Sequence, residues 1–237
     1  MSYYLNNSID AVRIWTVTDG AQGVFGTYSS TAIYPDGTLY KNASTNENGN
    51  QVLEFKDKEG KVILKKVQLT ATADAGAGSS HTGWLCTYYI YDDFSRLRCV
   101  IQPRGVELID PSWVLTDLTI LAEQCFRYEY DDRNRMIMKK VPGATEVYMV
   151  YDAKDRLVMT QDANMRAISK WMVILYDGLN RPVQTGLLLN TFNNYTFLQH
   201  LAAAYTNSTG YPFTTATTPA TTYWEYLTKS EIGRAHV

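Results

Sequence analysis

The stretch Tyr130-Asp131-Asp132-Arg133-Asn134-Arg135-Met136 decides the fold of this chain, because its pattern occurs four times. In each copy a Tyr-Asp pair is followed by three variable residues and then by Arg. The recurring positions are Tyr91, Asp92 and Arg96; Tyr130, Asp131 and Arg135; Tyr151, Asp152 and Arg156; and Tyr176, Asp177 and Arg181. Composition alone does not account for four copies, so the pattern indicates an array of one repeated unit.

Each copy predicts a β-hairpin. An aromatic or apolar run precedes every Tyr-Asp pair, and several of these runs alternate large and polar residues as a half-buried strand does. The Asp carboxylate can accept hydrogen bonds from backbone N–H groups two residues on, and the third residue after Asp fills a turn position of positive φ. Asn134, Asp155 and Asn180 suit that position, whereas Ser95 suits it poorly.

Other segments give weaker signals. A degenerate copy around Asp57 puts Gly60 in the positive-φ position and replaces Arg by Lys61. Residues 34–39 contain Asp36-Gly37 and predict a further hairpin. Residues 113–123 predict a short helix or loop inserted after the first repeat, and residues 194–205 predict a short helix with an Asn cap.

Composition narrows the function. The 237 residues are 45% hydrophobic, enough for one or two domains, and the 18 tyrosines favour strands. The 22 basic and 24 acidic residues are mixed along the chain, so we expect no nucleic-acid partner. No apolar run reaches the length of a membrane span, and the first residues lack the features of a signal peptide.

The sequence gives no support for catalysis, a cofactor or a metal. The three cysteines Cys86, Cys99 and Cys125 have no CxxC spacing, so we expect buried free thiols, with one disulfide plus a spare thiol as the alternative. His81 and His200 have no nucleophile motif beside them. We therefore predict that the chain is not an enzyme.

Binding alternatives remain for the repeated charges and the aromatic rings. The acid pairs Asp92-Asp93 and Asp131-Asp132 suit Ca²⁺ or glycosidase chemistry as well as turn tips, and the turn role is favoured. The repeated arginines suit anions, but we expect each to close onto the Asp of its own turn or a neighbouring Tyr. Trp84 and Trp171 suit either a glycan face or packing between hairpins.

The motif Tyr-Asp-x-x-[Gly/Asn/Asp]-Arg-[Leu/Met] resembles the YD repeat of RHS proteins, and residues 89–186 look more narrowly like RHS proteins of the Bacteroidota. The chain departs from that pattern by lacking Gly in the four clear turns, by Pro182, and by the insertion after the first repeat. The resemblance implies a mainly all-β fold, in which YD-repeat hairpins form a curved, open spiral β-sheet of a partial RHS shell with one or two short helices.

The same resemblance implies a function. The chain would be a structural repeat fragment of a large secreted or cell-surface protein whose shell encloses a C-terminal toxin or effector and helps to deliver it. Its partners would be the rest of its own shell and that effector. The alternative is a cell-surface carbohydrate-binding or adhesion module with glycan as its partner.

The chain is expected to have five segments. Residues 1–69 form an N-terminal β segment, residues 70–83 a flexible linker or loop, and residues 84–188 the hairpin array. Residues 189–230 form a helix, a loop and the start of the next repeat. Residues 231–237, Glu-Ile-Gly-Arg-Ala-His-Val, match the in-frame translation of a common sequencing adapter, so we expect this tail to be foreign and the natural chain to continue beyond Ser230.

Overall fold

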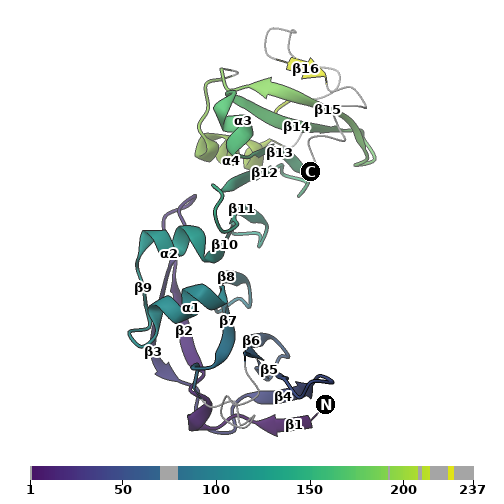
Figure 1. Ribbon diagram of the computed structural model, residues 1–237. Coiled ribbons are helices and arrows are strands. Elements are labelled where there is room, and N and C mark those ends of the chain that lie inside the picture. The colour runs from purple at the N-terminus through teal and green to yellow at the C-terminus, as the bar shows by residue number, and fades with distance from the viewer. Residues whose placement is uncertain (1, 70–79, 192, 208–209, 214–223, 227–237) are drawn as a thin grey trace. The chain divides into compact units, whose positions relative to one another are not determined.

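The computed structural model describes residues 2–69, 80–191, 193–207, 210–213 and 224–226 (Figure 1). The chain divides into two compact units, and the division falls at Tyr128/Glu129, inside the hairpin array. The expected linker (apart from residues 80–83) and the expected tail lie outside the described residues.

The first unit holds the N-terminal strands, the first YD hairpin, one 3-10 helix and two α-helices. Its elements are β1 (Ser2–Leu5), the 3-10 helix η1 (Ser8–Asp10), β2 (Arg13–Thr18), β3 (Thr27–Ile33), β4 (Tyr40–Thr45), β5 (Gln51–Lys56), β6 (Val62–Gln68), β7 (Trp84–Tyr91), β8 (Leu97–Ile101), α1 (Pro103–Ile109), β9 (Val114–Leu115), α2 (Leu118–Glu123) and the first four residues of β10 (Cys125–Tyr130).

The second unit holds the later repeats. Its elements are the end of β10, β11 (Met136–Lys140), β12 (Val147–Tyr151), β13 (Leu157–Gln161), α3 (Ala163–Ala167), β14 (Lys170–Tyr176), β15 (Pro182–Leu189), α4 (Phe197–Thr206) and β16 (Trp224–Tyr226).

The fold is mainly β, with antiparallel strands and a few short helices. The large sheet has the strand order β1-β4-β5-β6-β7-β8-β10-β11-β12-β13-β14-β15-β16, and β2-β3-β9 form a smaller sheet. Among the described strands, β1 and β16 each have one neighbour, so the large sheet is open. The expected mainly β class with an open sheet of hairpins is confirmed. No helix among the described residues combines the length and the apolar character that a membrane crossing requires.

In the first unit, the small sheet and α1 pack onto one face of the large sheet. Strand β7 alternates, and its inward residues Trp84, Cys86, Tyr88 and Ile90 are buried. Both α1 and β2 contact β7 (Figure 1). Tyr28 of β3 joins the same core. The period of two along β7 therefore produces this face, as its sequence predicts.

In the second unit, α4 covers a sheet face with the same alternation. Trp171, Val173 and Leu175 of β14 are buried, and the residues between them are partly exposed. The helix α4 packs against β12, and α3 packs against β14 and β13 (Figure 1). Leu201 and Ala204 bring α4 into this core.

Two local expectations are wrong. Residues 34–39 do not form a hairpin, because β3 pairs with β2 and β9 whereas β4 pairs with β1 and β5. Gly37 adopts φ 74° and its N–H donates to the Asn6 carbonyl oxygen, so this turn carries the chain from one sheet to the other. The helix α4 is capped by Thr196 instead of Asn194, which lies at φ 51°.

Other local features agree with the expectations or were not foreseen. The insertion after the first hairpin contains a helix, α2, where a short helix or loop is predicted. All three cysteines are free and buried, as expected. The sequence patterns did not predict the helices α1 and α3.

A buried ion pair ties η1 to β4. The Lys41 Nζ donates to the Asp10 Oδ1 over 2.6 Å, and the two side chains are 9% and 1% exposed. Lys66 is buried beside them and donates to the Asp10 carbonyl oxygen over 2.8 Å. Removing one member of such a pair leaves the other charge buried without compensation.

We predict that Asp10→Asn lowers the free energy of unfolding by about 3 kcal/mol, because the buried Lys41 ammonium then faces a neutral amide instead of a carboxylate. The double variant Asp10→Asn/Lys41→Met should recover most of that loss. Lys65→Met is the control, because that lysine lies on the exposed face. Urea unfolding measures all four proteins, and a loss below about 1 kcal/mol for Asp10→Asn contradicts the assignment.

Candidate functional site

The four Tyr-Asp turns share one geometry. In the third copy, the Asp152 Oδ1 accepts from the N–H groups of Lys154 and Arg156 over 2.9 and 3.0 Å. The Asp152 Oδ2 accepts from the Arg156 Nε over 2.7 Å. One carboxylate therefore holds two backbone amides and a guanidinium. The same three bonds recur at Asp92, Asp131 and Asp177.

The backbone closes each turn as the motif predicts. The N–H of Asp152 donates to the Arg156 carbonyl oxygen over 3.0 Å, and the N–H of Asp155 donates back to the Asp152 carbonyl oxygen over 3.1 Å. The φ angles of Asn134, Asp155 and Asn180 are 61°, 61° and 60°. These expected left-handed conformations are confirmed, and Ser95 adopts the same conformation at 63°.

The degenerate copy forms the same turn, but its cation contacts the carboxylate less closely than the arginines of the clear copies do. The Asp57 Oδ1 accepts from the N–H groups of Glu59 and Lys61 over 2.9 Å each. Gly60 lies at φ 83°. The Lys61 ammonium is 3.3 Å from the Asp57 Oδ2, where an arginine would add a directed N–H bond. The carboxylate therefore defines the turn, and the cation can vary.

The carboxylates differ in exposure. Asp152 is 1% exposed, whereas the Asp177 side chain is 22% exposed beside an Arg181 side chain that is 70% exposed. Burial alone raises the pKa of Asp92, but the Arg96 N–H and the neighbouring guanidiniums hold that pKa below its ordinary value. The Arg181 backbone N–H and guanidinium likewise lower the pKa of Asp177.

The cation of one turn also contacts the tyrosine of the next hairpin. The Arg156 guanidinium lies 4.8 Å from the centre of the Tyr176 ring, and Arg135 lies 5.1 Å from the centre of Tyr151. In the first unit, the Lys61 ammonium lies 5.6 Å from the Tyr91 ring. Cations over aromatic faces attract the ring quadrupole. We call these contacts, together with the Asp–cation pairs within each turn, the turn ladder.

Sheet register explains why the ladder has one direction. Met159 of β13 lies opposite Val173 of β14 in an antiparallel pair. Counting outward from that pair places Arg156 opposite Tyr176, and the equivalent count from Leu64 opposite Tyr88 places Lys61 opposite Tyr91. The motif Tyr-Asp-x-x-x-Arg therefore carries both the turn and the contact to the following hairpin.

One residue of the site lies outside the repeated motif. Arg98 is buried, and its Nη1 donates to the Asp92 Oδ2 over 3.1 Å and to the Asp19 Oδ1 over 2.6 Å. Its Nε donates to the Tyr128 carbonyl oxygen over 3.3 Å. The only signal in the sequence is a charged residue between apolar ones in a predicted return strand, which does not indicate burial.

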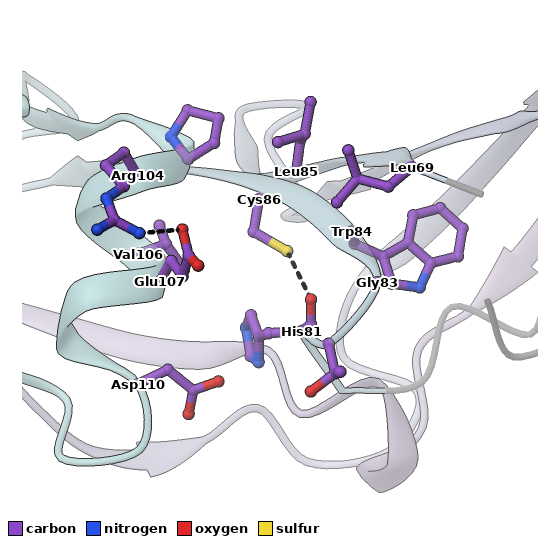
Figure 2. Close-up of a pocket in the computed structure, with 12 residues that line it drawn as sticks. Leu69, His81, Gly83, Trp84, Leu85, Cys86, Arg104, Val106, Glu107 and Asp110 are labelled. Atoms are coloured by element: carbon purple, nitrogen blue, oxygen red, sulfur yellow. Dashed lines mark hydrogen bonds and ion pairs between the residues drawn. The ribbon is translucent and has the colours of Figure 1, made fainter.

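A separate pocket of about 490 Å³ in the first unit contains His81 and Cys86. Figure 2 shows the Cys86 thiol directed at the His81 carbonyl oxygen, 4.0 Å away, and Arg104 paired with Glu107 on α1. Burial raises the pKa of the Cys86 thiol to about 12 and, with the charges of two nearby cations, lowers the pKa of His81 to about 3. The thiol and the imidazole are therefore both neutral near pH 7 and do not form an activated nucleophile.

The remaining sequence candidates fall in ordinary structural positions. Trp84 and Trp171 are 5% and 2% exposed, so they are core residues and cannot form the glycan face considered above. Asp93 and Asp132 are exposed at turn tips. His200 is buried, with its Nδ1 2.6 Å from the Tyr211 hydroxyl. Within the described residues, no three His, Cys, Asp or Glu side chains gather as a metal site.

Comparisons with known proteins find distant structural neighbours only. No family model matches the chain, and no curated protein matches it. A chain of the Tc holotoxin pore of Photorhabdus luminescens aligns over 70% of this chain and 8% of its own length, with 16% identity and a TM-score of 0.46. A chain of the TcdB2-TccC3-Cdc42 structure aligns over 77% of this chain and 9% of its own length, with 16% identity and a TM-score of 0.47. The chain thus spans less than a tenth of either neighbour.

We predict that Asp152→Ala lowers the free energy of unfolding by about 2 kcal/mol, because it removes charge-assisted bonds at a buried position. Asp177→Ala is the matched control, since the same bonds there are more exposed, and it should lower the free energy of unfolding clearly less than Asp152→Ala does. Arg156→Ala also loses the packing of its stem. The double variant Asp152→Ala/Arg156→Ala should cost less than the sum of the single variants. Equal losses at positions 152 and 177 in urea unfolding contradict the role of burial.

A second prediction concerns pH. Burial lowers the pKa of His81 to about 3 and that of His200 to about 4, whereas both histidines titrate near 6.5 in the unfolded chain. Between those values only the unfolded state takes up protons, so stability is full above pH 6.5 and decreases as the pH falls. The slope should be about 1.4 kcal/mol per pH unit for each histidine.

Urea unfolding at pH 7.5, 6.0 and 5.0 checks this expectation. The variants His81→Gln and His200→Gln should each remove about half of the loss between pH 6.0 and 5.0. A free energy of unfolding that stays constant down to pH 5 contradicts the burial of neutral imidazoles.

Proposed function

We propose that this chain is a structural part of the wall of a larger RHS-type protein, which encloses a C-terminal toxin or effector and helps to deliver it. The observation that carries the proposal is the turn ladder, in which the cation of one hairpin contacts the tyrosine of the next. Such contacts join successive hairpins edge to edge, which is what an extended wall requires.

The chemistry of the motif supports a scaffold. The Asp–Arg pairs are the most regular charged groups of the array. Each Asp carboxylate accepts hydrogen bonds from two backbone amides and from the Arg of its own turn, as at Asp152. In the pocket around His81 and Cys86, the imidazole and the thiol are both neutral. A role outside the producing cell, secreted or at its surface, follows from the proposed delivery. The partners would be the rest of the wall and the enclosed effector, and the chain itself would not catalyse a reaction.

A second candidate is a carbohydrate-binding or adhesion module. Its support is a group of exposed rings at the edge of the first unit, where Tyr3 is 72% exposed and Tyr40 is 55% exposed. Leu5 pairs with Tyr40 and Tyr3 pairs with Asn42, so these residues share one face of β1 and β4. Exposed aromatic faces suit the apolar faces of sugars.

Protease protection in the complete protein tests the wall. The C-terminal region should resist limited proteolysis in the native protein and become cleavable in the Asp131→Ala/Asp152→Ala variant, because two turns of the wall then lose their carboxylate. The variant Asp93→Ala is the control, since that acid lies exposed at a turn tip. A C-terminal region that is cleaved equally in native and variant proteins contradicts the proposal.

A glycan panel distinguishes the second candidate. If the chain binds carbohydrate, Tyr3→Ala/Tyr40→Ala should abolish retention on the panel while leaving the unfolding midpoint within about 2 °C of the native value. We expect no ligand on the panel. Specific retention that is lost in this variant would replace the scaffold assignment by the binding module.

A further inference from the structure

The positive φ of the left-handed turn position does not by itself decide which type of residue fills that position. Glycine adopts positive φ at the least cost, and Gly60 fills this position in the degenerate copy. The clear copies instead hold Ser95, Asn134, Asp155 and Asn180, all of which pay for the same conformation with a side chain present.

Three of these side chains accept a hydrogen bond from the preceding hairpin. The Lys61 Nζ donates to the Ser95 Oγ over 2.8 Å. The Arg135 Nη1 donates to the Asp155 Oδ1 over 2.8 Å, and the Arg156 Nη1 donates to the Asn180 Oδ1 over 3.1 Å. The contact occurs in both units, and each time it joins the cation of one turn to the left-handed residue of the next turn.

We propose that the left-handed turn residue is a specificity-determining acceptor, by which each hairpin recognises the cation of the hairpin that precedes it. The inference deepens the proposed scaffold function and rests on it. The tyrosine face and the acceptor contact the cation together, so a hairpin lacking either would dock less tightly. The acceptor would thus help to set which repeats can be neighbours.

The chemistry of the acceptor matches the number of cations that it meets. Asn180 is neutral and receives the single guanidinium of Arg156. Asp155 is anionic and receives two guanidiniums, because the Arg133 Nη1 lies 3.1 Å from its Oδ1 in addition to Arg135. The Arg133 hydrogen bond is the main cause that lowers the pKa of Asp155. An aspartate keeps its charge where two cations converge, and an asparagine suffices for one.

The competing explanation is that these residues are selected for φ alone. On that explanation Asn180→Gly is tolerated whatever the preceding hairpin contains. On the acceptor explanation Asn180→Gly loosens the contact between β13 and β14, but only while Arg156 is present. The two explanations therefore differ in whether Asn180→Gly loosens the contact and in whether that effect requires Arg156.

Native-state hydrogen exchange on the 237-residue chain measures this contact through the amides that pair β13 with β14, near Met159 and Val173. We expect Asn180→Gly to speed their exchange about fivefold in the native background, as loss of one charge-assisted bond implies. In the Arg156→Gln background the same substitution should change the rates less than twofold. Asn180→Asp keeps an acceptor and should not speed exchange.

Equal effects of Asn180→Gly in both backgrounds overturn the proposal, as does faster exchange in Asn180→Asp. If Arg156→Gln does not fold, the same cycle is run with Asp155→Gly and Arg135→Gln, the second pair of the ladder. Protease protection of the C-terminal region is a separate measurement. If the native C-terminal region is cleaved readily but the effect of Asn180→Gly still depends on Arg156, the scaffold function alone is refuted. If that region is protected but the effect of Asn180→Gly does not depend on Arg156, the acceptor role alone is refuted.

Discussion

A carboxylate that satisfies two backbone amides and a cation at once is the interaction on which the array depends. At Asp152 those groups lie 2.9, 3.0 and 2.7 Å from the carboxylate oxygens, and the residue is almost fully buried. The amides of so tight a turn cannot bond to a neighbouring strand, so they need a local acceptor. Because the cation neutralises the carboxylate, the turn can be packed against further hairpins without burying an uncompensated charge.

The turn ladder extends this local solution along the sheet. Arg156 serves its own turn through Asp152 and the following hairpin through Tyr176 and Asn180. Hydrophobic burial still provides most of the stability in each unit, through alternating residues such as those of β7 and β14. The ladder favours one pairing register between successive hairpins, because a shift of one residue would move the cation away from the ring that faces it.

Polar groups are also buried away from the turns. Asp10, Lys41 and Lys66 form a charged cluster in the first unit, and His81 and His200 are buried as neutral imidazoles with tyrosine hydroxyl partners. The two histidines, whose pKa values burial lowers, make the two cores sensitive to acid, unlike an apolar core of the same size. The pocket beside His81 holds a thiol whose pKa is raised by burial, so its chemistry is that of a packed side chain.

The sequence by itself determined the repeated turns, because Asp, the left-handed residue and Arg act within five successive residues and need no distant partner. It also determined the strand faces, through alternation. Tertiary structure decided what depends on distant contacts. The Asp36-Gly37 turn joins two sheets because β4 finds its partners in β1 and β5. The burial of Arg98 follows from Asp19 and Tyr128, which no local pattern connects to it. The contacts between hairpins likewise arise only once the strands have paired, since register alone brings Arg156 to Tyr176.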